Sequence, residues 1–360
     1  MKAQRMGRVL EEMKKAGVEQ MVLTNPYAIY YLAEHFENPG ERFWALVVKA
    51  DGHHTLIANR LFVLPKMEDM EILWYKDGED GTELLNQVTD PKKPLGIDET
   101  MAARFLLPLM GREAGSEYVL ASRCVDLVRA RKDQEEIEKM RSSSAVNDQA
   151  MEQFKKLIHP GVTERQVADQ LLAIYQSLGG ESHSFPPIVA FGANAAVGHH
   201  EPDDTVLKSG DCVLFDVGCV RRGYCSDMTR TFFYGSADEE QKKVYETVKR
   251  AQLAAEAAIR PGAALCEIDR IARSVIEEAG YGEYFTHRLG HFIGMEEHEK
   301  GDVSLASELV AEPGMIFSIE PGIYLPGKVG VRIEDLVLVT EEGVEILNHY
   351  SKELEILPEA

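Results

Sequence analysis

Four acidic residues lie in two otherwise apolar stretches, at spacings that can bring them together in pairs. Asp216 and Asp227 lie symmetrically about one polar turn, and Glu320 and Glu334 lie symmetrically about another. Each stretch predicts a β-hairpin, because β-branched and aromatic residues surround turn-forming ones. Across such a hairpin the two acids would face each other on one side of the sheet, with Cβ atoms about 5 Å apart.

Two acid pairs of this kind predict a binuclear metal centre. Like charges that face each other destabilise a sheet unless a cation lies between them, and four buried carboxylates are costly without one. Two divalent ions would balance the four charges and hold a bridging water at a metal separation of about 3.5–4 Å. Carboxylate oxygens suit Mn, and added imidazole also suits Zn, Co or Fe. Any one of these acids, taken alone, could instead be an ordinary residue at a strand end.

Three histidines within one short segment could complete the centre. The segment HRLGHFIGMEEHE contains His287, His291 and His298, and its glycines allow close approach of the backbone. A second pair, His199 and His200, lies in the stretch NAAVGHHEPDD. The remaining histidines have no such context, and we predict no role for them.

A repeated helix pattern predicts the elements that position these residues. Two helices separated by Pro-Gly recur after an offset of 101 residues, and strand-rich sequence follows each pair. Ser236 and Glu239 form an S-x-x-E pattern typical of a capping box, which predicts the start of the third helix. The four predicted helices cover about residues 133–158, 164–178, 236–259 and 267–279. This internal duplication predicts a pseudo-symmetric α+β domain with its site in the cleft between two halves. The alternative is that two helices around Pro-Gly recur by chance.

The first third of the chain predicts a smaller domain of mixed α/β type. Helix patterns alternate there with short β-branched runs, so we place an N-terminal domain at residues 1–125 and the catalytic domain at 126–360. The predicted strands cover residues 18–24, 43–49, 54–57, 70–75 and 117–120, and the predicted helices cover the N-terminus up to residue 17, 84–88 and 102–110.

Composition excludes several classes of function. The chain has 360 residues, with 39 Lys and Arg against 60 Asp and Glu, for a net charge of −21. Such an acidic surface repels phosphate backbones, so we expect no nucleic-acid partner. We also expect no membrane span, because no apolar run reaches about 18 residues. The N-terminus lacks the apolar core of a signal peptide. The spacing of the five cysteines matches neither a disulfide framework nor a zinc site, so we expect free thiols and a cytoplasmic location.

The order of five motifs resembles the pita-bread metallopeptidases, and within them the Xaa-Pro dipeptidase (prolidase) and Xaa-Pro aminopeptidase branch. The motifs are FDVG, YCSDMTRTF, HRLGHFIGMEEHE, SIEPGIY and VGVRIED. The resemblance implies a C-terminal pita-bread (creatinase/aminopeptidase-like) catalytic domain after a creatinase/prolidase-like N-terminal domain. It also implies a homodimer that hydrolyses small proline-containing peptides. The implied cofactor is two divalent metal ions per chain, with Mn first and Co, Zn or Fe as alternatives. The implied metal ligands are Asp216, Asp227, His291, Glu320 and Glu334.

The resemblance also implies roles in catalysis. Hydroxide formed from the metal-bridging water would attack the carbonyl before proline, and His199 or His298, together with a metal, would stabilise the developing oxyanion. Glu320 would shuttle a proton as well as bind metal. His287 and Arg332 would line the substrate pocket.

The chain departs from the family pattern at three places. Phe292 replaces the second glycine of a Gly-His-Gly triplet, and its ring could narrow the pocket. Lys300 follows the histidine segment where several dipeptidases have an arginine that holds the substrate carboxylate, so we expect Lys300 or Arg332 to replace it. The loop at residues 38–42 resembles a D-P-H-E-R loop of dipeptidases that reaches the partner's site in a dimer, but its Asp and His are not kept.

Three other functions remain open at this point. The first is an Xaa-Pro aminopeptidase that removes the residue before proline from longer peptides. The second is a non-catalytic binding protein on the same fold, and the third is a metal-free creatine-type hydrolase. The complete acid cluster disfavours the last two, because it would be costly without metal.

Overall fold

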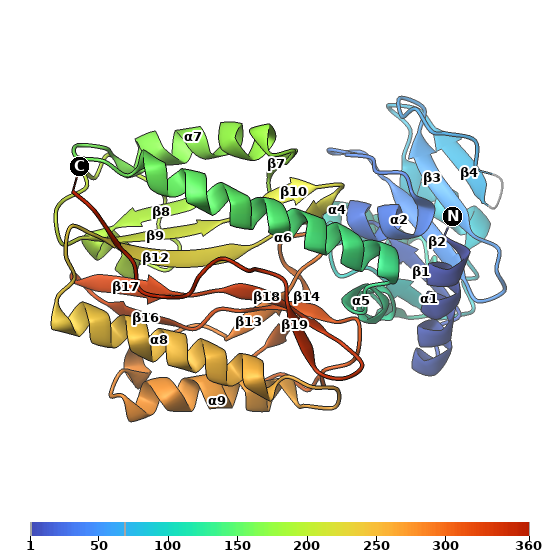
Figure 1. Ribbon diagram of the computed structural model, residues 1–360. Coiled ribbons are helices and arrows are strands. Elements are labelled where there is room, and N and C mark those ends of the chain that lie inside the picture. Colours follow the sequence, from blue (N-terminus) through green and yellow to red (C-terminus); the bar gives the residue numbers. More distant parts are fainter. Residues whose placement is uncertain (1, 68–69, 360) are drawn as a thin grey trace. The chain divides into compact units, whose positions relative to one another are not determined.

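The computed structural model describes residues 2–67 and 70–359, which form two compact units (Figure 1). The first unit ends at Arg129 and the second begins at Ala130. Each unit has its own sheets and its own hydrophobic core. Within the described ranges, no helix has both the length and the apolar character needed to span a bilayer.

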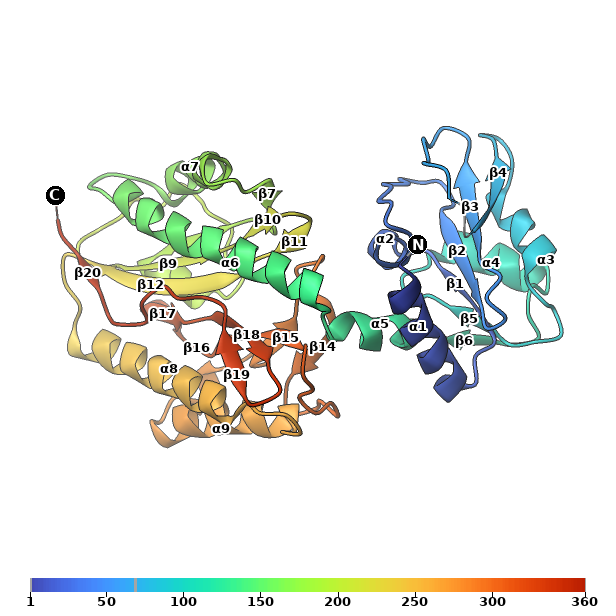
Figure 2. The ribbon, with the colours of Figure 1, turned by 45° about the vertical axis from the view of Figure 1, so that its right-hand side comes forward.

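The first unit is a mixed sheet with helices on both of its faces. Its strands are β1 (Gln20–Leu23), β2 (Ala45–Lys49), β3 (Thr55–Asn59), β4 (Glu71–Tyr75), β5 (Leu95–Ile97) and β6 (Tyr118–Leu120). Its helices are α1 (Ala3–Ala16), α2 (Pro26–Ala33), α3 (Leu85–Val88), α4 (Ala103–Gly111) and α5 (Arg123–Ala130). The strand order is β4-β3-β2-β1-β5-β6. Figure 2 shows α1 and α2 on one side of this sheet and α3 and α4 on the other.

The five strands predicted for this unit are present, but α2, α5 and β5 were not predicted. The helix α2 begins where the Asn25 side chain accepts a hydrogen bond from the Ala28 N–H, with Pro26 in the first turn. The strand β5 has only three residues, and a Cβ at Gly96 would lie 2.6 Å from the Ala121 side chain. Elements this short carry too few residues for a periodic pattern to be recognised.

The second unit places strands between two pairs of helices (Figures 1 and 2). The helices are α6 (Gln134–Phe154), α7 (Glu164–Ser177), α8 (Glu239–Ala258) and α9 (Leu265–Glu278). One sheet has the order β20-β12-β9-β8, formed by β8 (Ile188–Phe191), β9 (Cys212–Val217), β12 (Met228–Tyr234) and β20 (Ile356–Leu357). The helices α6 and α7 share a hydrophobic core with this sheet.

The second half of this unit is built in the same way. The helices α8 and α9 share a core with a sheet of order β14-β13-β15-β18-β19 and with the ribbon β16-β17. These strands are β13 (Gly290–Phe292), β14 (Glu299–Val303), β15 (Ile316–Ile319), β16 (Gly322–Leu325), β17 (Val329–Arg332), β18 (Asp335–Val339) and β19 (Val344–Ile346). A small sheet in the first half contains β7 (Ser182–His183), β10 (Cys219–Arg221) and β11 (Tyr224–Cys225).

The predicted duplication is confirmed in detail. The helices α7 and α9 begin at 164 and 265 and end at 177 and 278, so both ends are offset by 101 residues. The residues before them, Thr163 and Ala264, are offset by the same number, and both form isolated antiparallel bridges, to Val206 and Val310. The α+β fold class with pseudo-two-fold halves is therefore correct.

The predicted cap of the third helix is wrong by two residues. The helix α8 begins after Asp238, whose side chain accepts from the Gln241 backbone N–H, while the Gln241 side chain accepts from the Asp238 N–H. The pattern at Ser236 and Glu239 also satisfies S-x-x-E, but the Ser236 N–H bonds to the Tyr234 carbonyl oxygen in a tight turn at Gly235, where φ is 73°, so the helix begins later. Asp is as good an N-cap as Ser, so sequence alone did not separate the two.

In the first acid hairpin the centre of the turn lies one residue further along the chain than predicted, so the partner of Asp216 lies two residues further along. Asp216 pairs with Thr229, not with Asp227. The cause is a two-residue turn at Arg222 and Gly223, which have φ values of 53° and 74° and thereby match a primed hairpin turn. Because Asp227 is two positions from Thr229, the two acids remain on the same side of the ribbon but are diagonal to each other.

The second acid hairpin has the predicted register. Gly322 pairs with Arg332 in the β16-β17 ribbon, and Ile319 pairs with Asp335 between β15 and β18. Glu320 and Glu334 occupy the short interruption between these two ladders and lie opposite each other. The turn is at Gly327, which has a φ of 72°.

Candidate metal centre

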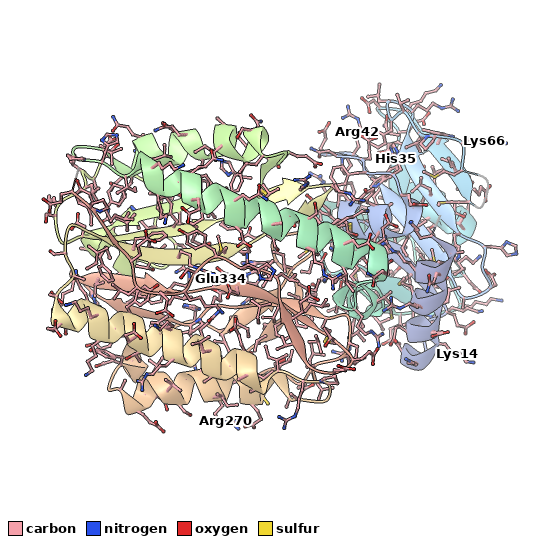
Figure 3. All side chains as sticks on the ribbon, viewed as in Figure 1. Lys14, His35, Arg42, Lys66, Arg270 and Glu334 are labelled. Atoms are coloured by element: carbon pink, nitrogen blue, oxygen red, sulfur yellow. The ribbon has the colours of Figure 1, made fainter. Side chains whose placement is uncertain are left out.

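The five predicted metal ligands line one cavity of about 730 Å³ in the second unit. The cavity lies between the two halves of the duplication, because strands of both halves contribute ligands. Figure 3 labels Glu334, which lies in the interior of this unit between the helix pairs. Asp216 is in β9, Asp227 directly precedes β12, His291 is in β13, Glu320 directly follows β15, and Glu334 directly precedes β18.

The His291 imidazole is the point at which three of the carboxylates meet. Its Nε2 atom is 3.5 Å from Asp227 Oδ2, 3.5 Å from Glu320 Oε1 and 4.0 Å from Glu334 Oε1. Its Nδ1 atom lies 3.2 Å from the Phe292 carbonyl oxygen, which can accept a hydrogen bond from Nδ1. Burial, and then His298, lower the pKa of His291 to about 3. A neutral ring with Nδ1–H bonded to a carbonyl presents its Nε2 lone pair to a metal.

Two of the acids have buried oxygen atoms that no described protein group satisfies. Asp227 and Glu334 are 3% and 2% exposed, and Asp227 Oδ1 and Glu334 Oε1 have no hydrogen-bond partner in the part of the chain that the structure describes. Burial, and then the charge of Glu334, raise the pKa of Asp227 well above its ordinary range. Burial, and then the charge of Glu320, do the same to the pKa of Glu334. This cost disappears when divalent ions occupy the centre, so these residues fit a metal.

Other oxygens of these acids are held by neighbouring side chains. The Thr229 hydroxyl donates to Glu334 Oε2 at 2.7 Å, and the Ser318 hydroxyl donates to Glu320 Oε1 at 3.1 Å. Ser318 also accepts from the His291 backbone N–H at 3.0 Å. Such contacts orient ligands before a metal arrives.

Arg332 and His287 belong to one hydrogen-bonded chain in the cavity wall. Arg332 Nη2 donates to Asp216 Oδ2 at 2.5 Å, and its Nη1 donates to the Tyr324 hydroxyl at 2.7 Å. That hydroxyl is 2.8 Å from His287 Nε2. Burial, and then Arg332, lower the pKa of His287 to about 4, so this imidazole is neutral at pH 7. Both residues line the cavity as expected, but the Arg332 guanidinium already has partners within the protein.

His199 and His298 lie at the open side of the same cavity. Both line it, and both are exposed. The His298 ring centroid is 4.0 Å from that of His291. Burial, and then Arg288, lower the pKa of His298. Either imidazole can therefore donate to an oxygen bound next to the carboxylate cluster.

The expectation that Lys300 or Arg332 holds the substrate carboxylate stays a prediction, and the structure adds Arg288 to the cations that line the cavity. Lys300 is absent from the described lining of the cavity, and Arg332 is bonded to Asp216 and Tyr324. The lining contains Arg288 instead, whose Nη1 atom is 4.0 Å from Asp302 Oδ2. Arg288 lies next to His287 in the chain, on the segment that leads into β13. The sequence shows an arginine at this position, but it does not show that the side chain points into the cavity.

The structure corrects the expectation about Phe292. Its ring is fully buried and lies 5.5 Å from the Phe317 ring, within the core shared with α8 and α9. It contacts the backbone at Gly301, where a Cβ would lie 2.7 Å from the ring. Successive residues of a strand point to opposite faces, so His291 faces the cavity and Phe292 faces away from it. The ring does not narrow the pocket.

Tyr324 and Thr229 were missed by the sequence analysis. Both contact residues of the centre through their hydroxyl groups. Strand alternation could have indicated Tyr324, because it is four residues after Glu320 on the same hairpin. A Cβ at Gly322 would lie 2.4 Å from the Tyr324 hydroxyl, so glycine is required there for this oxygen to reach Arg332.

Two family models match this chain. Residues 138–341 match metallopeptidase family M24, and residues 5–131 match the creatinase/prolidase N-terminal domain. An uncharacterized peptidase of Staphylococcus aureus (strain bovine RF122 / ET3-1) is 38% identical over 357 residues, which cover 97% of this chain and 99% of the relative.

Solved structures of peptidases have the same fold. A dipeptidase from Pyrococcus horikoshii OT3 is 34% identical, with a TM-score of 0.90 over 98% of this chain and 100% of that one. An Xaa-Pro dipeptidase from Bacillus anthracis is 32% identical, with a TM-score of 0.88 over 98% and 99%. An X-Pro aminopeptidase from Thermotoga maritima is 26% identical, with a TM-score of 0.81 over 96% and 99%.

The family model for M24 covers more than half of the chain, and the relatives match along nearly all of it. The residues of the cavity fit the divalent metals that M24 metallopeptidases use. The chain therefore belongs to metallopeptidase family M24 and is a peptidase with a creatinase/prolidase N-terminal domain and a pita-bread catalytic domain.

Proposed function

We propose that this peptidase is an Xaa-Pro dipeptidase that depends on two divalent metal ions. The observation that carries the proposal is the cluster of Asp227, His291 and Glu334, whose ligand atoms lie within 4.8 Å of one another and include two unpartnered carboxylate oxygens. Asp216 and Glu320 complete the proposed ligand set on the same cavity. The similarity to dipeptidases and to an Xaa-Pro dipeptidase supports the choice of substrate.

The residues around the cluster can carry the hydrolysis. Ions held by the five ligands would supply a polarised water whose pKa is lowered toward neutrality. Glu320, which lines the cavity beside His291, would accept and return the proton of this water. His199 and His298 would donate hydrogen bonds to the carbonyl oxygen as negative charge develops on it.

The cavity wall also suits the two ends of a dipeptide. Phe185, Pro186, Pro187 and Ile188 form an apolar stretch that could pack against a proline ring. Arg288 is the cation that we assign to the free carboxylate of the substrate, because Arg332 is engaged within the protein. An arginine binds a carboxylate through two parallel hydrogen bonds.

Mass spectrometry of the products tests this assignment. Metal-stripped protein with Mn²⁺ added back would be given an equimolar mixture of Met-Pro and Met-Pro-Ala. We expect cleavage of Met-Pro, and an Arg288→Met variant should lose affinity for it. Release of Met from the tripeptide alone would identify an Xaa-Pro aminopeptidase, and no cleavage of either peptide would contradict a proline-specific peptidase.

The remaining features are proposed on the resemblance. They are Mn²⁺ as the native metal, a homodimer, and a cytoplasmic location in which the five cysteines remain free thiols. Metal analysis of protein purified without chelator and sedimentation of the holoenzyme test the first two. A preparation with other metals, or a monomer, would contradict them.

A further inference from the structure

A buried glutamate holds the loop that carries His199. Glu164, the first residue of α7, is fully buried, and its carboxylate accepts four hydrogen bonds. The donors are the backbone N–H of Phe191 at 2.7 Å, Asn194 Nδ2 at 3.0 Å, His200 Nε2 at 2.6 Å and the backbone N–H of Asp203 at 3.1 Å. These bonds reach both ends of the segment 191–203, and His199 lies between them.

Glu164 and its four donors, which we call the clasp, hold a backbone segment by hydrogen bonds and do not form a further metal site. Glu164, His200 and Asp203 lie close enough together to resemble a cation site. However, a separation of 2.6 Å between His200 Nε2 and Glu164 Oε2 is a hydrogen bond and leaves no room for an ion between them. An ionised carboxylate only accepts, so His200 Nε2 must carry the hydrogen. The four donors also compensate the cost of burying Glu164.

We propose that Glu164 and His200 are positioning residues for His199. The inference rests on the proposed function, in which His199 donates to the substrate carbonyl oxygen. His200 is the neighbour of His199 in the chain, and its Nε2 is committed to Glu164, so the bond fixes where the backbone presents His199. A displacement of about 1 Å at a catalytic group can lower turnover by about a hundredfold.

A double-mutant cycle in the metal-loaded protein tests the clasp. We expect His200→Ala to lower kcat on Met-Pro about 10- to 100-fold, with little change in KM or metal content. In a His199→Ala background the same substitution should have little further effect, because His200 would act through His199. His200→Gln should recover part of the loss, since its amide can donate to Glu164. Independent, multiplicative losses in the double variant would overturn the proposal.

A second readout does not depend on turnover. Hydrogen exchange of the backbone amides in segment 191–203 should accelerate in Glu164→Gln and His200→Ala and should stay near wild type in His199→Ala. If the wild-type protein fails to cleave Met-Pro, the proposed function fails, but exchange still decides whether the clasp holds this segment. Unchanged exchange in both clasp variants would overturn it. Glu164→Gln keeps the volume of the side chain, so it serves if His200→Ala does not fold.

A different observation concerns an acid in the cavity wall. Glu297 lines the cavity and is partly buried, and its one ion-pair contact is His298 Nε2 at 3.7 Å. Among the described residues, no Lys or Arg nitrogen lies within 4.0 Å of its carboxylate. A partly buried carboxylate without a cation is a cost to the fold that a cationic ligand would offset.

We infer that Glu297 binds a positive charge on the substrate residue that precedes proline. This inference also rests on the proposed function and adds specificity to it. The charge has two sources, the α-ammonium that every dipeptide carries and the side chain of Lys or Arg. Glu297 precedes the proposed catalytic His298, so its carboxylate lies close to where the scissile bond would be held.

Paired substrates distinguish the two sources. Lys-Pro and norleucine-Pro have the same chain length at the first residue but differ in the side-chain charge. We expect Glu297→Gln to lower kcat/KM about tenfold for Lys-Pro alone if the side chain is bound, or to lower both kcat/KM and binding affinity equally for both dipeptides if the α-ammonium is bound; an equal loss in kcat with unchanged affinity would mean that Glu297 acts through His298 and would overturn the inference. The matched control is Glu296→Gln, which removes the same charge from a neighbour outside the described cavity lining and should leave the ratio of the two substrates unchanged.

Binding measured by calorimetry separates this inference from the proposed function. If neither dipeptide is cleaved, the proposed function fails, but binding of Lys-Pro and norleucine-Pro to the metal-loaded protein can still be compared with and without Glu297→Gln. Equal affinities in wild type and variant for both dipeptides, or equal kcat/KM values, would overturn the role of Glu297.

Discussion

Arg332 donates a hydrogen bond of 2.5 Å to Asp216, and thereby joins the two halves of the duplication across the proposed metal centre. Asp216 belongs to β9 of the first half, and Arg332 ends β17 of the second. Both side chains are mostly buried. The acid is thus paired and oriented even where no ion is bound.

Arg332→Met should therefore weaken both the fold and the centre. Removal of one partner from a buried ion pair costs about 3–5 kcal/mol, because the other charge is left uncompensated. Urea unfolding of chelator-treated protein measures the stability, and metal analysis of the metal-loaded protein after dialysis measures retention. A variant with wild-type stability and metal content would show that the Asp216 pair contributes nothing.

Asp227→Asn should abolish turnover and weaken metal binding. The amide keeps the shape of the side chain but removes the charge that faces Glu334 and His291, so we expect a loss of more than about a thousandfold in kcat. Activity and metal content of the purified variant check this. The control is Asp204→Asn, at an exposed aspartate that pairs with Arg165 on the surface. Near-normal turnover of Asp227→Asn would refute the ligand assignment.

His298→Ala should lower turnover and leave the metal in place. The His298 ring packs beside His291, but its Nε2 atom lies 3.7 Å from Glu297 and does not enter the carboxylate cluster. Loss of one donor to a developing oxyanion costs about 100- to 1,000-fold in kcat. Steady-state kinetics and metal analysis give both numbers. Loss of metal in this variant would instead make His298 a ligand.

The metal-free protein should become less stable as pH rises. Burial raises the pKa of Glu320 from 4.5 to about 7, and the pKa values of Asp227 and Glu334 are raised in the same direction. Between about pH 4.5 and 7 the folded protein therefore holds carboxyl protons that the unfolded chain has released, so these acids lower the free energy of unfolding as pH rises, by an amount on the order of a few kcal/mol. The lowered pKa values of His287 and His291 oppose this effect below about pH 6.5, where the unfolded histidines bind protons, so the fall is expected above pH 6.5.

Urea unfolding of chelator-treated protein at pH 6.5 and pH 7.5 measures this effect. The midpoint should be lower at pH 7.5, and saturating Mn²⁺ should raise it more at pH 7.5 than at pH 6.5, because metal binding displaces the protons. Chelator-treated protein that is more stable at pH 7.5 would show that these carboxylates are ionised without metal.

Phe292→Ala should destabilise the protein without widening its specificity. The ring is fully buried against Phe317, on the strand face opposite to His291. Loss of a buried phenylalanine costs about 3–5 kcal/mol. Unfolding measurements give the stability, and KM for several Xaa-Pro dipeptides at a temperature where the variant is folded gives the specificity. A changed order of substrates would place the ring in the pocket after all.

Much of the architecture could be predicted because it depends on local patterns. The duplication was visible because Pro-Gly ends one helix before α7 and another before α9, and chain breakers act within one or two residues. The second acid hairpin was predicted in the correct register because Gly327 marks its turn. In the first hairpin the partner of Asp216 lies two residues further along than predicted, because Arg222 adopts a positive φ next to Gly223, and a non-glycine residue rarely adopts that conformation.

The sequence by itself determined which residues can meet at the cavity. They are acids and histidines spaced along strands so that the alternation of side chains between the two faces places them on the same face. Only the tertiary structure decided what each of them contacts. Arg332 is committed to Asp216, Arg288 faces the cavity in place of Lys300, Phe292 packs in the core, and Glu164 holds a loop that begins 27 residues later at Phe191. The physical reason is that alternation and turns act within a few residues, whereas burial and hydrogen-bond partners depend on segments brought together by packing.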